Sequence, residues 1–200
     1  SAAVRAIPGV THVSMVEQLP LTGRSGCTGV VTNQPSATGR REQCVTTLQV
    51  APGYFEAMKI PVRGSASTWN DEHQGSGGAV VTRALAEVLW PGEDPIGRTI
   101  RCCSVADGWF HVTGVVDDLY DAGLDAPPMQ AVFFPLVAPP GADLQWLARG
   151  VNLVVRAPTL TPAQLYPLVQ REVARLDPQV PVTNPRPLDE VVARSMARRT

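Results

Sequence analysis

The chain has 200 residues, of which 44% are apolar, enough to build a core and too many for wholesale disorder. Its 17 basic and 18 acidic residues leave a formal net charge of −1, which argues against nucleic acid as a partner. No stretch of about 18 apolar residues occurs, so no segment is expected to span a membrane. The sequence begins with Ser1 rather than Met and shows no signal peptide, so we expect it to be processed or excised from a longer chain.

The first third predicts two strands, a loop and a short helix. Alternating apolar residues predict strands at residues 10–19 and 44–50. Between them, residues 22–43 are rich in glycine, serine and threonine and predict a long loop or a loose hairpin. Pro52 and Gly53 then introduce a short helix that buries aromatic side chains on one face.

The middle of the chain predicts short strands around one helix. Residues 64–78 read as a surface loop, and a strand follows at residues 78–81. Thr82 is the expected N-cap of a helix that ends at Pro91 and Gly92. Further strands are expected at residues 98–105, 109–116 and 131–134, the first two forming a hairpin about an Asp-Gly turn.

The last third has the clearest helix signals. After an expected strand at residues 151–156, Thr161 and Gln164 have the spacing of a capping box, with proline at the first helical position. Pro167 predicts a kink or a later helix start. A strand at residues 180–183 and a helix from Leu188 should follow. That helix reaches the end of the sequence without a cap, so we expect the natural chain to continue.

The predicted elements form an α+β chain, with strand and helix units at both ends and a middle block that looks inserted between two halves of one subdomain. Cys27 and Cys44 flank the polar loop and are the favoured disulfide pair, whereas Cys102 and Cys103 are less favoured because neighbours in a strand point to opposite faces. A crossed pairing and free thiols stay open as alternatives.

Signals for catalysis or metal binding are weak. The serine-hydrolase, Walker and dinucleotide-binding motifs are absent, and so is the paired-histidine helix of zinc proteases. Two acidic groups could hold a cation but fit solvated loops better, and the basic end of the chain could contact lipid headgroups or be a solvated helix end. The scattered candidates for such sites are His12, His73, His111, Asp71, Glu72, Asp117, Asp118, Asp121, Asp125, Arg194, Arg198 and Arg199.

Five motifs in order resemble the MacB-like periplasmic core domain of FtsX-like ABC-transporter permeases, above all the duplicated orphan permeases of acidobacteria. The most specific are residues 50–64 (VAPGYFEAMKIPVRG) and residues 80–98 (VVTRALAEVLWPGEDPIGR). Residues 7–10, 112–118 and 176–182 fit as well, so the resemblance covers essentially the whole chain. Thr82 stands where the family often has asparagine.

The resemblance implies a domain inserted between two membrane helices of a permease, on the periplasmic side of the bacterial inner membrane. It implies a porter-like subdomain in two halves, residues 1–62 and 137–200, with a smaller, mainly β sabre-like subdomain over residues 63–136 between them. The implied role is to transmit ATP-driven conformational change for efflux or envelope export, with no catalysis and no cofactor. The implied partners are the permease's own membrane helices, a second permease copy or half, a cytoplasmic ABC ATPase acting indirectly, and a periplasmic adaptor.

Two other interpretations stay open. A stand-alone periplasmic binding or assembly protein would have a cleaved signal and no downstream membrane helix. An enzyme would need a deep pocket that unites His73 or His111 with Asp117 and Asp118.

Overall fold

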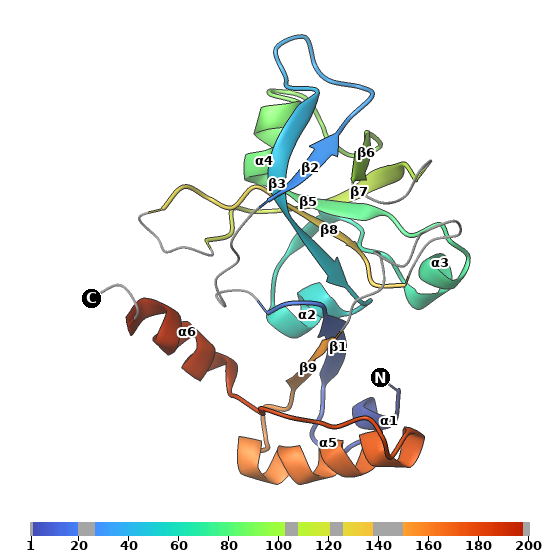
Figure 1. Cartoon of the computed structure of the whole chain (residues 1–200), viewed down its shortest axis with the longest axis vertical. Helices are drawn as coiled ribbons and strands as arrows, with labels where there is room; N and C mark the ends of the chain where they lie inside the picture. Colours follow the sequence, from blue (N-terminus) through green and yellow to red (C-terminus); the bar gives the residue numbers. More distant parts are fainter. Residues whose placement is uncertain (1, 20–26, 103–107, 121–125, 138–149, 198–200) are drawn as a thin grey trace.

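The computed structural model describes residues 2–19, 27–102, 108–120, 126–137 and 150–197. The molecule is elongated, with most strands gathered at one end and a long helix at the other (Figure 1). We call the strand-rich end, residues 27–137, the barrel lobe. The other end, residues 2–19 and 150–197, is the α5 lobe. This mixed architecture confirms the α+β fold class.

Six strands of the barrel lobe form a closed ring. In ring order the neighbours are β2, β6, β7, β5, β8 and β3, and β3 pairs again with β2. Their bounds are β2 (Thr28–Val31), β3 (Glu42–Val50), β5 (Ala79–Thr82), β6 (Thr99–Cys102), β7 (Phe110–Val116) and β8 (Ala131–Pro135). The short strand β4 (Val62–Gly64) adds to β7 outside the ring. Closure removes sheet edges that would otherwise expose unpaired backbone groups.

The nine-residue strand β3 links the two lobes. Its first half pairs with β2, so that Val45 faces Thr28. Its second half runs parallel to β8, and its last residue, Val50, faces Val16 of β1 (His12–Val16). β1 then pairs antiparallel with β9 (Asn152–Arg156), which carries the sheet into the α5 lobe.

Of the helices in the described residues, three lie at the barrel lobe and three in the α5 lobe. α2 (Tyr54–Met58) packs against β1 and β9, α3 (Trp69–His73) lies beside the barrel, and α4 (Arg83–Leu89) covers β3, β5 and β8. In the α5 lobe, α1 (Ala2–Arg5) packs on α5 (Pro162–Leu176). The last helix is α6 (Leu188–Ala197), which extends to one side (Figure 1).

The apolar residues separate into three clusters. The largest includes Val81, Leu89, Trp90 and Phe134, each at most 1% exposed, between the ring and α4. A second cluster joins Tyr54 of α2 to the barrel strands. The third and smallest lies in the α5 lobe, and its four buried members are Val4, Ile7, Val13 and Val169.

Most local predictions are confirmed, including the Thr82 cap and the Thr161–Gln164 capping box. The strand predicted at residues 180–183 is wrong, because this segment passes along α5 and the Tyr166 hydroxyl donates to the carbonyl of Val182. The loop expected at residues 64–78 contains α3. Residues 22–43, expected to form a long loop or a loose hairpin, contain β2, which pairs antiparallel with β3 as in a hairpin. Pro167 does not delay the helix, which begins at Pro162.

Strand β2 pairs with β6, and β3 pairs with β8. Strands before the predicted boundary at residue 62 therefore pair with strands after it. The division into residues 1–62, 63–136 and 137–200 stays a prediction.

Candidate functional site

The narrow junction between the lobes is the first candidate site. We call it the waist and define it by Ser14, Ala51, Ala57, Asn152 and Arg156. The buried Ser14 hydroxyl donates to the carbonyl of Ala51 over 2.9 Å, and the amide of Ala51 donates to Met15 over 2.8 Å. The Asn152 side chain donates to the carbonyl of Glu17 over 3.0 Å. The first two bonds fasten β1 to Ala51, between β3 and α2, and the third fastens β9 to the residue after β1.

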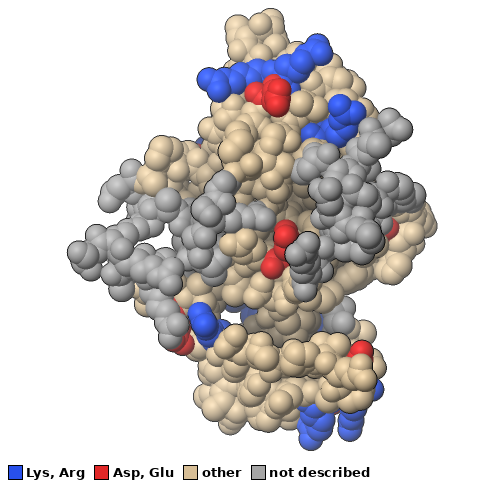
Figure 2. Space-filling view, in the orientation of Figure 1, with Lys and Arg blue, Asp and Glu red and all other residues tan. Residues whose placement is uncertain are grey.

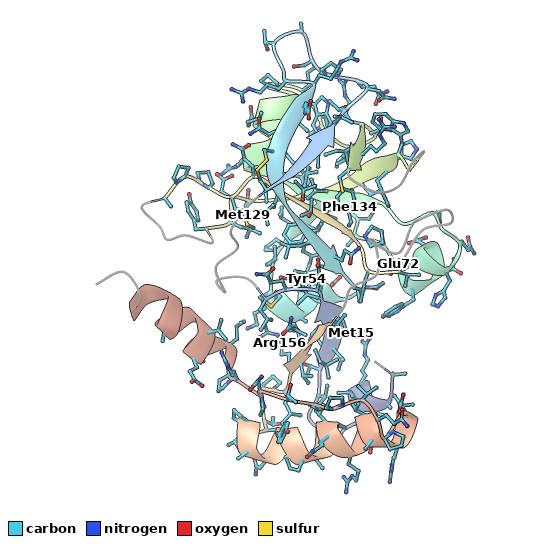
Figure 3. All side chains as sticks on the ribbon, viewed as in Figure 1. Met15, Tyr54, Glu72, Met129, Phe134 and Arg156 are labelled. Atoms are coloured by element: carbon cyan, nitrogen blue, oxygen red, sulfur yellow. A yellow bond between two sulfur atoms is a disulfide. The ribbon has the colours of Figure 1, made fainter. Side chains whose placement is uncertain are left out.

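Arg156 makes the strongest link across the waist. Its Nε and Nη2 atoms donate to the carbonyl of Ala57 over 2.9 and 2.5 Å. The last carbonyls of a helix lack partners within the helix, and a cation stabilises that end of the helix dipole. Arg156, which lies on β9, therefore caps the C-terminal end of α2. Figure 3 labels Arg156 below Tyr54 of that helix. Charge-assisted bonds of this kind contribute about 1.5–3 kcal/mol each when buried.

The second candidate is Glu72 of α3, a carboxyl group that is only 4% exposed. Its Oε2 atom accepts a hydrogen bond from the amide of Val137 over 3.2 Å. Burial raises the pKa of Glu72 from 4.5 to about 7, against a smaller opposing effect of the Val137 amide. The adjoining cavity of about 10 Å³ holds at most one water molecule, so it is no site for an organic ligand.

A third candidate is a groove of about 500 Å³ between α4, β4 and the turn after α4. Val115 and Val116 are among its lining residues, which also include charged side chains. Arg63 pairs with Asp94 at 3.1 Å, Arg83 pairs with Asp118 at 2.6 Å, and Arg98 pairs with Glu93. The Ile96 amide, and then Arg63, hold the pKa of Asp94 below its usual value.

Charge is scattered on the face drawn in Figure 2. Among the described residues on this face, Lys and Arg atoms lie mainly at the tip of the barrel lobe and below α5, and separate Asp and Glu groups lie at the tip and between these two places. Ion pairs this exposed are typically worth 0–1 kcal/mol each. This face therefore presents no broad field of one sign.

The structure does not bring the sequence-predicted site residues together. His73 lies on α3, where its Nδ1 atom is 2.5 Å from the carbonyl oxygen of Trp69, and His111 is exposed on β7. Neither histidine lines the groove that contains Asp117. Asp121 and Asp125 lie outside the described residues, as do Arg198 and Arg199. Within the described part, no three His, Cys, Asp or Glu side chains are grouped as a metal site requires.

The structure joins Cys27 to Cys44 by a disulfide, with 5.4 Å between the Cα atoms. The bond joins Cys27, the residue before β2, to Cys44 in β3, beside the hairpin that closes the ring. Cys102 at the end of β6 is also disulfide-bonded, and Cys103 lies outside the described residues.

Comparison with protein families decides what kind of domain this is. The profile of the MacB-like periplasmic core domain matches residues 2–176. The chain belongs to this family. No curated protein matches the sequence of this chain.

Solved structures share its fold at low sequence identity. A domain of a putative permease protein from Porphyromonas gingivalis has a TM-score of 0.56 at 17% identity, covering 97% of this chain and 87% of that one. The periplasmic region of MacB from Actinobacillus actinomycetemcomitans gives 0.53 at 14% identity, with 100% of both chains covered. The extracellular domain of the noncanonic ABC-type transporter YknZ from Gram-positive bacteria gives 0.52 at 16%, covering 88% and 78%.

The two most specific motifs have structural roles in this MacB-like domain. Residues 50–64 run from the end of β3 through α2 to β4, and Gly53 takes a left-handed φ of 85° before Tyr54. Residues 80–98 include α4 and its closing turn, where the Trp90 indole donates to the carbonyl of Gln34 over 2.8 Å. The motifs therefore mark the waist and the attachment of α4.

Sequence reasoning missed Arg156, and it placed Glu72 in a solvated loop, with a cation site as the less favoured alternative. Arg156 ends a predicted strand, and nothing local shows that it reaches Ala57, which lies 99 residues away in the sequence. The available signal for Glu72 was a Thr68–Asp71 capping box, which predicts a helix where a loop was expected. Among the described residues, no helix is both long and apolar enough to cross a membrane.

Proposed function

We propose that this MacB-like periplasmic core domain is the extracytoplasmic domain of an ABC-transporter permease and transmits ATP-driven conformational change across the membrane for efflux or envelope export, without catalysis of its own. Its partners would be the membrane helices of the same permease, a second permease copy or half, a cytoplasmic ABC ATPase that acts indirectly, and a periplasmic adaptor. In a bacterium with two membranes it would lie on the periplasmic side of the inner membrane.

The observation that carries this proposal is the hydrogen-bonded waist. A domain that passes on motion needs a junction that resists bending, because a flexible linker would absorb the displacement. Here β3 is shared by the ring and the sheet of the α5 lobe, and Arg156 locks β9 to α2. The barrel lobe should therefore follow a movement that begins in the α5 lobe.

The test uses the full-length permease with its ATPase in lipid nanodiscs. A spin label at the exposed Arg41 reports the distance between the barrel lobes of two permease copies, and a label at the exposed Gln170 reports the distance between their α5 lobes. Labels on noncanonical amino acids leave the native cysteines intact. In the wild type, both distances should change between the nucleotide-free and the ATP-bound state.

Arg156→Ala tests the waist itself. It should keep ATP hydrolysis and the change at Gln170 but reduce the change at Arg41, because the barrel lobe is no longer held. Arg171→Ala is the matched control, since Arg171 is exposed on α5 and its described ion pair is with Glu172 of the same helix. Wild-type distances that are the same with and without ATP would overturn the proposal.

A further inference from the structure

Glu72 is a buried ionisable group that the proposed function leaves unused. It lies on the inner side of α3, against the ends of β3 and β8, as its label in Figure 3 indicates. The cavity beside it is lined by backbone and apolar groups and by one hydroxyl, that of Ser67. Apart from Glu72, none of the described residues that line this cavity is titratable.

Among the described residues, the charged groups that act on Glu72 are on its own helix. His73 and Asp71 act on it in opposite directions, and both effects are smaller than that of burial. Asp71 is held by the Thr68 hydroxyl and amide, with its Oδ2 atom 2.7 and 2.8 Å from them. The environment of the Glu72 carboxyl is therefore dominated by removal from water, which disfavours its charged form.

The segment that carries Glu72 is built as a small unit. The capping box closes the start of α3, and the Ser76 amide and hydroxyl donate to the carbonyl of Asp71 over 2.9 and 3.2 Å. Gly64 and Gly75 have left-handed φ values of 90° and 69°, on either side of α3. Such a unit can move away from the barrel without losing its internal bonds.

Glu72 holds this unit to the chain that leaves the barrel. The Val137 amide donates to Glu72, and the amide of the preceding residue, Leu136, donates to the carbonyl of Val50 over 3.0 Å. Pro135 also packs against the α3 segment, where a side chain at Gly77 would meet it at 2.7 Å. The contact therefore connects α3, β3 and the exit of β8.

We propose that Glu72 is a pH-operated latch: in its neutral form it holds α3 on the exit of β8, and on ionisation it leaves the cavity and releases α3. The latch does not depend on the proposed transport function. It would let the pH outside the cytoplasm set how firmly the chain is held where it leaves the barrel.

The expected size of the effect follows from the two protonation equilibria. The carboxyl titrates at about 7 in the closed state and at 4.5 when it is in solvent, so ionisation favours the open state. Between pH 5.5 and pH 8 the ratio of released to closed α3 should rise by about 30-fold.

Hydrogen exchange of the whole 200-residue chain tests this. After correction for intrinsic exchange rates, protection of the amides of α3 and of Val137 should fall by about 30-fold from pH 5.5 to pH 8. In Glu72→Gln, which cannot ionise, that fall should disappear. Glu87→Gln, which removes an exposed carboxylate from α4, is the matched control and should behave as the wild type.

Two results would overturn the latch: wild-type protection that does not change with pH, or a fall that persists in Glu72→Gln. If Glu72→Gln fails to fold, carbon-13 NMR titration of Glu72 in the wild type decides instead. A midpoint near 7 supports the latch, and a midpoint near 4.5 overturns it.

Discussion

In the barrel lobe every strand of the ring has a hydrogen-bonded neighbour on both sides, whereas in the described α5 lobe β9 pairs with β1 alone. The barrel lobe contains the largest apolar cluster and most of the second, and its strand β8 is fully buried. Strand β9 is half-buried at all five positions, and Leu176 at the end of α5 is 70% exposed. The comparison teaches that the barrel lobe supplies its own stability, while the α5 lobe depends on what holds it at the waist.

The largest expected effect comes from breaking the barrel core. Phe134 is 1% exposed and packs on Phe110 with 4.9 Å between ring centroids. Phe134→Ala should lower the free energy of unfolding by about 3–5 kcal/mol, from lost apolar burial and the cavity left behind. Urea unfolding followed by circular dichroism measures it. A loss below about 1 kcal/mol would contradict the barrel as the source of stability.

The disulfide is the next largest effect. Cys27 and Cys44 are 17 residues apart, and closing such a loop stabilises a folded chain by about 3 kcal/mol in the chain-entropy model. The double variant Cys27→Ser/Cys44→Ser should lose about that much, with hydrogen exchange rising first in β2 and β3. Peptide mapping without reductant is the control. It should recover the Cys27–Cys44 peptide pair, and a different pairing would refute the prediction.

A pH series tests Glu72 at the level of global stability. The folded protein binds this proton more tightly than the unfolded chain, because burial raises the pKa of Glu72 from 4.5 to about 7. Its contribution is therefore present at low pH and is lost as the pH rises from 4.5 to 7. Glu72→Gln should be more stable than the wild type by about 3 kcal/mol at pH 8 and by about 1 kcal/mol at pH 5.

Chemical denaturation at both pH values, with Glu87→Gln alongside, checks this sign. If Glu72→Gln differed from the wild type equally at pH 5 and pH 8, ionisation of Glu72 would not be the cause.

The smallest effect sharpens the contrast between the lobes by using one substitution in each. Val169 lies in the cluster of the α5 lobe and Val81 in the cluster of the ring, and they are 6% and 0% exposed. Val169→Ala should cost about 1 kcal/mol and raise hydrogen exchange in α1 and α5 alone. Val81→Ala should cost about 2 kcal/mol and lower the protection of the whole barrel. Equal, global effects would mean that the two lobes unfold as one unit.

Local signals in the sequence determined much of this protein. Thr82 and Thr161 predicted the starts of α4 and α5 because N-caps depend on side chains and amides a few residues apart. The ordered motifs were enough to predict the family, which the match to residues 2–176 confirmed. The predicted strands and helices indicated the α+β fold class, because strand and helix units occur at both ends of the chain.

Other features were decided only by the tertiary structure. Ring closure pairs β2 with β6 and β3 with β8, strands far apart in the sequence whose partners no local pattern names. The alternating residues 180–183 form no strand, because β propensity gives a strand only where a sheet edge accepts it. Arg156 and Glu72 acquire their roles from Ala57 and Val137, which folding brings to them across 99 and 65 residues of sequence. Helix caps and the periodic spacing of apolar residues depend on neighbours along the chain, whereas the waist and the buried carboxyl of Glu72 depend on neighbours in space.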